Sequence, residues 1–107
     1  MISIVIPNYN GARHIKGCME ALARQTLKAE EIIIVDNCST DGSLELIKYY
    51  YPSVKLISLD KNYGFSKAVN VGIKHSKHPY VVLLNNDTEA ESTWLEELYK
   101  AILSRSD

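Results

Sequence analysis

Four short apolar runs, separated by segments of helical periodicity, constrain the fold of this chain more than any other feature. The runs are rich in Ile, Val and Leu, each is followed by polar turn residues, and they cover residues 2–7, 31–36, 54–59 and 80–84. Their hydrophobicity is continuous rather than alternating, which is typical of strands covered on both faces in a parallel sheet. We therefore predict four buried, parallel strands.

Helices are predicted between and after these strands, because apolar residues recur there at a spacing of three and four. The stripes comprise Ile15, Cys18, Met19, Leu22 and Ala23 in the first segment, Leu44, Ile47 and Lys48 in the second, Ala68, Val71 and Gly72 in the third, and Trp94, Leu95, Leu98 and Ile102 in the fourth. The fourth helix is expected to start at Thr93, where Glu96 would complete a capping box.

The order β-α-β-α-β-α-β-α predicts an α/β fold with three layers. Right-handed crossovers give a doubly wound, mainly parallel sheet with strand order 3-2-1-4 and ligands at the carboxyl ends of the strands. A length of 107 residues suits a single domain, residues 1–107, and the chain contains no repeat or Gly/Ser linker. The polar residues 104–107 are interpreted as a frayed end or as the place where a longer protein was cut.

Composition excludes several classes of function. The net charge is -1 and the 12 basic residues are scattered among 13 acidic ones, so we expect no nucleic acid partner. Cys18 and Cys38 lack metal-site spacing and are interpreted as reduced thiols. No apolar run approaches the length of a membrane-spanning helix, and the first residues do not resemble a signal peptide. A cytoplasmic location, or the cytoplasmic face of a membrane, is therefore expected.

Polar loops follow all four predicted strands, at residues 8–11, 36–42, 61–64 and 85–88. Turn chemistry alone explains many of their Asn, Asp and Gly residues. The carboxyl ends of parallel strands meet at one edge, however, so the four loops should converge there. This convergence predicts a site for a polar ligand.

Two acidic residues in these loops, Asp36 and Asp87, end apolar strands. The second and fourth strands flank the first, which separates the two carboxylates by roughly 10 Å, or two strand spacings. One could accept a hydrogen bond from a nucleotide base while the other holds Mg²⁺ or Mn²⁺. The helices after Gly42 and Gly64 would offer free amides to anions. Neither a P-loop nor a G-x-G-x-x-G string is present, which excludes those nucleotide-binding motifs.

The strings at residues 4–10, 25–26, 31–37, 39–43, 62–65, 68–72 and 83–88 occur in an order and spacing that resembles the N-terminal half of family 2 glycosyltransferases. The resemblance covers essentially the whole chain. It implies a Rossmann-like GT-A fold that binds a nucleoside-diphosphate sugar. The Asn-Asn-Asp-Thr string at residues 85–88, together with Gly64-Phe65, resembles a bacterial branch that includes rhamnosyltransferases and other enzymes of cell-surface polysaccharide synthesis.

The resemblance implies roles for particular residues. Pro7, Tyr9 and Asn10 would line the nucleotide pocket, Asp36 would bind the base edge, and Asp87 would hold Mg²⁺ or Mn²⁺ as the last acid of a D-x-D motif. The full set of candidate donor-binding residues is Pro7, Asn8, Tyr9, Asn10, Asp36, Asn37, Asn62, Gly64, Asn85 and Asn86.

Two departures from the family pattern are visible. Asn85 occupies the first D-x-D position, so Asp87 is the only formal anion for the cation, and metal affinity without nucleotide should be low. The carboxylate that deprotonates the acceptor hydroxyl lies, in such enzymes, in a C-terminal half that these residues do not include. Glu89 and Glu91 are interpreted as surface charges near a helix start. No catalytic residue is therefore assigned.

The sequence is also compatible with other functions. A non-catalytic nucleotide-binding module, or one that self-associates through the exposed edge of the fourth strand, is the main alternative. A nucleotidyltransferase would need a basic, Gly-rich phosphate loop after the first strand, where this chain offers only Arg13. The sequence also allows a full-length enzyme with this domain to associate peripherally with a membrane.

Overall fold

The central strand of the sheet is β1 (Ile2–Asn8), which is buried along its whole length. In the computed structural model, which describes residues 1–104, β1 pairs in parallel with β2 (Glu31–Asp36) and with β4 (Tyr80–Leu83), and β2 pairs with β3 (Lys55–Ser58). The order β3-β2-β1-β4 confirms the predicted 3-2-1-4 arrangement. The strand bounds differ from the prediction by one residue at most at each end.

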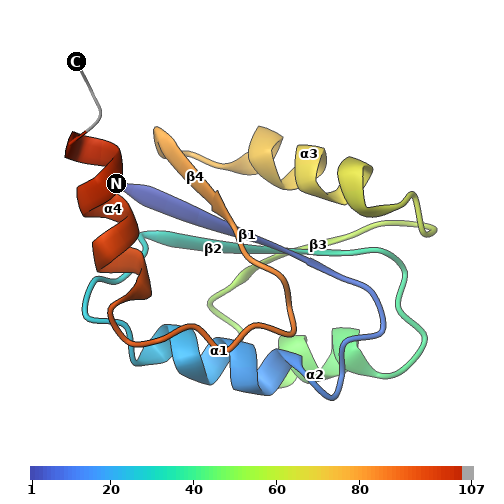
Figure 1. Ribbon diagram of the computed structural model, residues 1–107. Helices are drawn as coiled ribbons and strands as arrows, with labels where there is room; N and C mark the ends of the chain where they lie inside the picture. The colour runs from blue at the N-terminus through green and yellow to red at the C-terminus, as the bar shows by residue number, and fades with distance from the viewer. Residues whose placement is uncertain (105–107) are drawn as a thin grey trace.

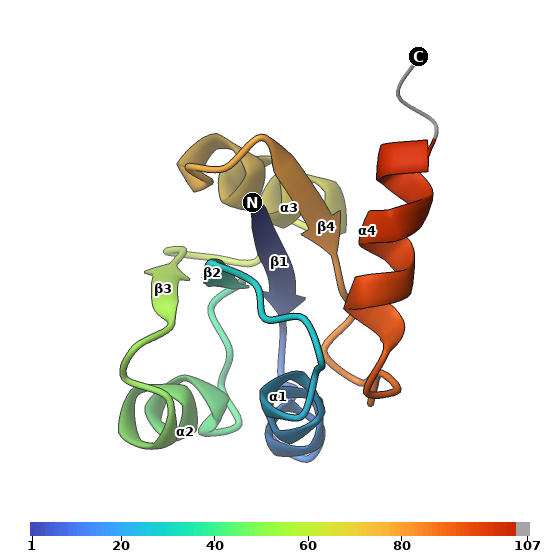
Figure 2. The ribbon, with the colours of Figure 1, turned by 90° about the vertical axis from the view of Figure 1, so that its left-hand side faces the viewer.

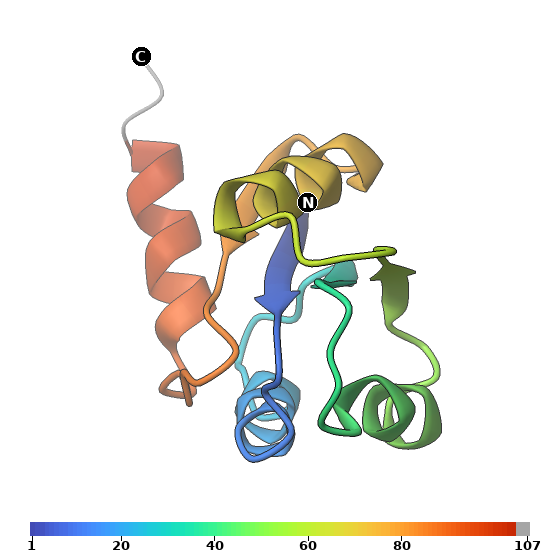
Figure 3. The same cartoon turned by 90° about the vertical axis from the view of Figure 1, so that its right-hand side faces the viewer.

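The helices cover both faces of the sheet, as Figures 1 and 2 show. The helices α1 (Ile15–Ala23) and α2 (Ser43–Tyr50) lie on one face, and α3 (Phe65–His75) lies on the other. The last helix, α4 (Trp94–Ser104), runs beside β4, which is also visible from the opposite side in Figure 3. This arrangement confirms the doubly wound, three-layer fold. The rest of the predicted polar end, residues 105–107, lies outside the described residues.

None of the helices within residues 1–104 is long and apolar enough to cross a membrane.

The sheet separates two apolar cores, because successive strand residues point to opposite faces. The larger core joins the sheet to α1, α2 and α4, and its buried members include Ile4, Ile6, Ile34, Leu22 and Leu95. The smaller core lies under α3 and consists of Val5, Ile33, Val35 and Ala68. The two inner strands are thus buried on both faces, and their carboxyl ends are held in fixed register: Asn8 is paired with Asp36.

The edge strands differ from the prediction of full burial. All four residues of β3 are half-buried or exposed, and Leu83 of β4 is 44% exposed. The reason is geometric, because α3 packs on β1 and β2 and leaves part of β4 uncovered. Continuous hydrophobicity therefore indicates burial on both faces for the inner strands but not for the edges.

The predicted capping box at the start of α4 is wrong. The Glu96 carboxylate, which would have accepted a hydrogen bond from the Thr93 amide, instead accepts one from Thr26 Oγ1 at 2.6 Å and pairs with Lys100 at 3.1 Å. The preceding loop is anchored by Gln25, whose Nε2 donates to Glu91 O and whose Oε1 accepts from Leu95 N. A tertiary contact with the residues after α1 has replaced the local cap.

Two glycines offer a test of how closely α3 packs on the sheet. A Cβ on Gly72 would lie 2.4 Å from Val5 Cγ1, inside the smaller core, whereas a Cβ on Gly17 of α1 would meet only the flexible end of Glu89. We expect Gly72→Ala to lower the free energy of unfolding by about 1–2 kcal/mol, because overpacking exceeds the gain in helix propensity. Gly17→Ala is the matched control and should be neutral or stabilising by about 0.5 kcal/mol.

Urea denaturation of the two variants measures both effects. A Gly72→Ala variant as stable as wild type would contradict the close approach of α3 to Val5.

Candidate functional site

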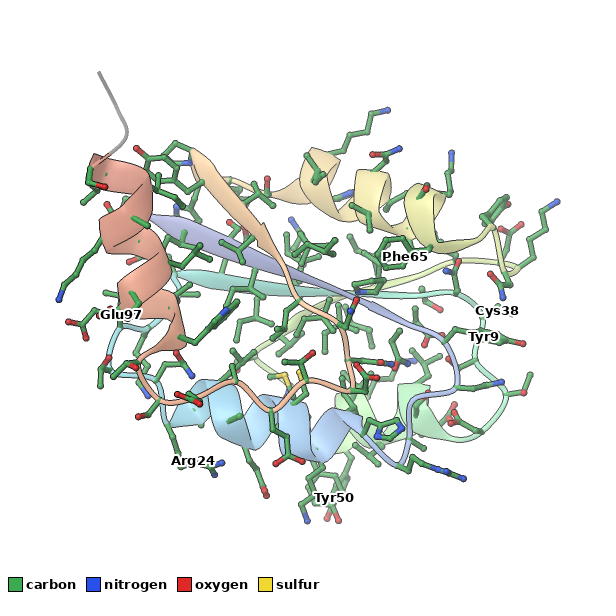
Figure 4. All side chains as sticks on the ribbon, viewed as in Figure 1. Tyr9, Arg24, Cys38, Tyr50, Phe65 and Glu97 are labelled. Carbon is green, nitrogen blue, oxygen red and sulfur yellow. The ribbon has the colours of Figure 1, made fainter. Side chains whose placement is uncertain are left out.

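A cleft of about 360 Å³ opens at the carboxyl ends of the strands. All four predicted loops contribute to it, and its lining comprises Pro7, Asn8, Tyr9, Asn37, Asn62, Gly64, Phe65, Asn85, Asn86 and Asp87. Figure 4 shows Tyr9 and Phe65 together at this end of the sheet, and Glu97 at the other end. Of the predicted site residues, only Asn10 and Asp36 are not part of the lining.

Asn10 ties the loops after β1 and β2 to each other. Its Oδ1 accepts a hydrogen bond from Thr40 N at 2.8 Å, and its backbone amide donates to Ser39 Oγ at 2.9 Å. Asp41 adds a second tie, because its carboxylate accepts from Ala12 N at 2.9 Å. Asn10 adopts a positive φ of 51°, a conformation that asparagine tolerates better than most residues. Asn10 therefore shapes the rim of the cleft rather than its wall.

Asp36 ends β2 as predicted, but its side chain is fully buried. Oδ2 accepts a hydrogen bond from Ser39 N at 2.9 Å, and Oδ1 accepts from Ser39 Oγ at 2.7 Å and from Asn8 Nδ2 at 2.8 Å. The prediction that this carboxylate binds a base edge directly does not fit this geometry. These three hydrogen bonds offset the cost of burying the carboxyl group, and Asp36 organises the loop after β2.

Asn37, the next residue, joins the loop after β2 to the loop before α3. Its Nδ2 donates to Gly64 O at 3.1 Å and its Oδ1 accepts from Tyr63 N at 3.2 Å. Asn62 Oδ1 accepts from Gly64 N at 2.8 Å, which closes a tight turn. Gly64 has a φ of 93°, which a residue with a side chain would adopt only with strain. The turn brings the N-terminus of α3 to the cleft.

The loop after β4 carries the predicted metal ligand. Asp87 is exposed, lines the cleft, and accepts no hydrogen bond from another group within residues 1–104. Asn85 O lies over the buried Cys18, whose thiol donates to it at 3.8 Å. Burial first, and then the nearby carboxylates of Asp87 and Glu89, raise the pKa of Cys18 to about 11. The group beneath Asn85 is thus the neutral thiol of Cys18.

The two acids considered near Asp87 lie away from the cleft lining. Glu89 rests against α1 at Gly17, and Glu91 lies beside Trp94 and Leu98 at the start of α4. Phe65 is the lining residue that the sequence analysis did not assign to the site. Its exposure, 54%, is unusual for a phenylalanine, and its position directly after Gly64 was the available signal.

The cleft combines one free carboxylate with the amide side chains of Asn85 and Asn86 and with a helix N-terminus. Hard cations such as Mg²⁺ and Mn²⁺ prefer oxygen ligands and are often held by one or two carboxylates together with substrate phosphates. Within residues 1–104 no group of three or more His, Cys, Asp or Glu side chains could form a complete metal cage. The residues present therefore suit a cation that arrives with an anionic ligand.

Comparisons with known proteins agree with this arrangement. The model of the family described as glycosyl transferase family 2 matches residues 3–107. An uncharacterized glycosyltransferase of Escherichia coli, YibD, is 42% identical over 91% of this chain. A cholesterol galactosyltransferase of Borreliella burgdorferi is 37% identical over 92% of it. The chain spans 29% and 28% of the lengths of these two relatives.

Among solved structures, S. aureus TarS in complex with UDP-GlcNAc superimposes with a TM-score of 0.85 at 27% identity. The superposition covers 96% of this chain and 31% of that one.

The two cysteines provide a test of the site geometry, because Cys18 is buried beneath the loop that carries Asp87 while Cys38 is exposed. A thiolate is the reactive form, and a pKa of about 11 leaves roughly a thousandth of Cys18 ionised at pH 8. We expect iodoacetamide to label Cys38 in the folded chain and Cys18 only after denaturation. Mass spectrometry that finds both thiols labelled at equal rates would contradict the position of this loop.

Proposed function

The chain belongs to glycosyl transferase family 2, and on that premise we propose that it binds a nucleoside-diphosphate sugar, together with Mg²⁺ or Mn²⁺, for transfer of the sugar to an acceptor hydroxyl. The observation that carries the proposal is the cleft at the carboxyl ends of the strands, which joins an exposed, unpaired carboxylate, Asp87, to a polar wall. A doubly wound sheet generally binds its ligand at this edge.

Each side of the cleft suits one part of such a donor. Pro7, Tyr9 and Asn37 form a wall with an exposed aromatic ring, which suits a nucleotide base. Gly64 lies at the N-terminus of α3, where free backbone amides favour phosphate oxygens. The binding of UDP-GlcNAc by TarS, a structural neighbour, supports this chemical class of ligand.

Asp87 is the residue proposed to hold the divalent cation, with the side-chain oxygens of Asn85 or Asn86 as neutral neighbours. A bound cation would neutralise charge on the diphosphate leaving group. Because Asp87 is the one carboxylate in the lining, the protein alone should bind the cation weakly, and nucleotide and cation should bind together.

Transfer to a hydroxyl also needs a general base within hydrogen-bond reach of the acceptor. Neither Glu89 nor Glu91 lines the cleft. We therefore propose that the base comes from outside residues 1–104, and that the chain acts as the donor-binding part of a glycosyltransferase. The limited share of its relatives' length that the chain spans supports this division of labour.

We propose that the acceptors are hydroxyls of cell-surface polysaccharides, because the Asn-Asn-Asp-Thr string at residues 85–88 resembles that of enzymes that synthesise such polysaccharides. We further propose that the protein acts in the cytoplasm and associates peripherally with the cytoplasmic face of the membrane. The membrane association is supported by one segment that departs from the even charge mixture of the whole chain, because residues 46–80 contain six lysines and a single acidic residue, Asp60. Lys67 and Lys74 of this segment are exposed on α3, where they could approach anionic lipids.

Binding of UDP and GDP, measured by calorimetry with and without Mn²⁺, tests the proposal. We expect Mn²⁺ to strengthen the binding of one of these nucleotides. Asp87→Ala should remove this enhancement, a loss of about tenfold or more in affinity, because the charge-assisted contact is gone. Its fold should be unchanged, since Asp87 is exposed.

Glu97→Ala is the matched control, because Glu97 is an exposed acid at the opposite end of the sheet (Figure 4) and should not alter binding. Equal nucleotide affinities for wild type and Asp87→Ala in the presence of Mn²⁺ would show that the metal role is misassigned.

A second candidate is a module that self-associates without catalysis. Within the described residues β4 pairs with β1 only, and Leu83, on the face of β4 that α3 leaves uncovered, is 44% exposed. Exposed strand edges with apolar side chains pair readily with other chains.

For this candidate, light scattering should show a mass that rises with concentration, and Leu83→Lys should return it to that of a monomer. A constant monomeric mass, together with nucleotide binding, would contradict it.

A further inference from the structure

The side chain of Asn8 is the centre of a buried network that connects three loops of the cleft. It is 1% exposed. Its Nδ2 donates to Asp36 Oδ1 at 2.8 Å and to Ser43 Oγ at 3.0 Å. Its Oδ1 accepts a hydrogen bond from Asn86 Nδ2 at 2.7 Å. One amide therefore joins the end of β1 to the loop after β2, to the start of α2 and to the loop that carries Asp87.

The direction of each hydrogen bond in this network is fixed. Both oxygens of Asp36 act as acceptors, from Ser39 N, Ser39 Oγ and Asn8 Nδ2, so Asn8 turns its NH₂ group toward β2. Asn8 then presents only its oxygen to Asn86, and Asn86 must donate. The amide oxygen of Asn86 is consequently the atom that remains for a ligand. Asp36, although buried, thus determines which atom of Asn86 faces an incoming group.

The backbone of the buried Gly11 packs against the hydrogen bond between Asn8 and Asn86. A Cβ at Gly11 would lie 2.2 Å from Asn86 Nδ2 and 2.4 Å from Asn8 Oδ1. Both distances are far below contact distance, so no side chain fits there. The Asn8–Asn86 hydrogen bond is therefore packed against the Gly11 backbone on one side, while Asn86 lines the cleft on the other.

We propose that Asp36, Asn8 and Asn86 form a one-way hydrogen-bond relay that positions the metal-binding loop. In this relay Asn86 must be an amide, because a carboxylate at position 86 would face the oxygen of Asn8. The three are positioning residues, and they act on the ligand through the orientation of Asn86 and the placement of Asp87. The effect on binding rests on the proposed function, whereas the relay itself does not.

A pair of isosteric substitutions tests the proposal, with Mn²⁺ and UDP or GDP as probes. Asn85→Asp and Asn86→Asp each add one carboxylate beside Asp87, and both residues line the cleft. Simple electrostatics predicts that either change strengthens the Mn²⁺-dependent part of nucleotide binding. The relay predicts that Asn85→Asp strengthens it, whereas Asn86→Asp weakens it by about tenfold because two oxygens would face each other.

A reversed relay provides the rescue. In the double variant Asp36→Asn with Asn86→Asp, the new amide at position 36 can donate to the oxygen of Asn8, which then turns its NH₂ group toward the carboxylate at position 86. Ser39 and Ser43 can follow, because a hydroxyl both donates and accepts. The total charge equals that of wild type. We expect the double variant to recover most of the Mn²⁺ enhancement that Asn86→Asp alone loses.

Thermal unfolding of wild type, the two single variants Asp36→Asn and Asn86→Asp, and the double variant tests the relay without any nucleotide. Each of Asp36→Asn and Asn86→Asp should lower Tm, and the double variant should regain most of the loss. If neither UDP nor GDP binds wild type, the proposed function fails while this cycle still decides the relay. Additive losses of Tm in the double variant, or stronger Mn²⁺-dependent binding by Asn86→Asp, would overturn the proposal.

Discussion

The cleft depends on one buried amide. Asn8 lies at the end of the central strand, in register with Asp36 on β2, and its two polar ends bind groups from loops that are far apart in the sequence. An unsatisfied amide at this depth would cost of the order of 1–3 kcal/mol. Among residues 1–104, no buried side-chain nitrogen or oxygen lacks a partner. The loops are therefore fixed by hydrogen bonds that the sheet itself supplies, and the cleft between them has a defined shape.

The strand order places the Asn8 side chain between two loops of the cleft. Because β2 and β4 flank β1, the loops after them lie on either side of Asn8, and α3 crosses the other face to bring Gly64 to the same edge. The close packing of Gly72 on Val5 allows that approach. The result is a rim on which the buried Asp36 and Asn8 hold Asn86, the residue before the exposed Asp87. Specific binding generally requires ligand-binding side chains that are held in place by buried hydrogen bonds.

Much of this could be predicted from the sequence, because continuous apolar runs and helical stripes indicate element type, and right-handed crossovers favour the doubly wound strand order. The role of Asp36 could not, since a carboxylate at a strand end has the same local signature whether it faces the cleft or the interior. A buried and a cleft-facing Asp36 are distinguished only by the register of β1 with β2, in which Asn8 lies next to Asp36. The capping box at Thr93 failed for a similar reason, because Thr26, distant in sequence, competes for Glu96. Local patterns do not report such tertiary partners.

In the proposed function, a divalent cation and a nucleotide bind together at the loop after β4. Paramagnetic broadening by Mn²⁺ of the amide resonances of ¹⁵N-labelled protein, recorded in the presence of UDP or GDP, tests this most directly. If the cation binds at Asp87, the amides of residues 85–88 broaden first, followed by those of residues 7–11 across the cleft. Broadening centred on Glu96 and Glu97 at the opposite end of the sheet, with residues 85–88 unaffected, would contradict it.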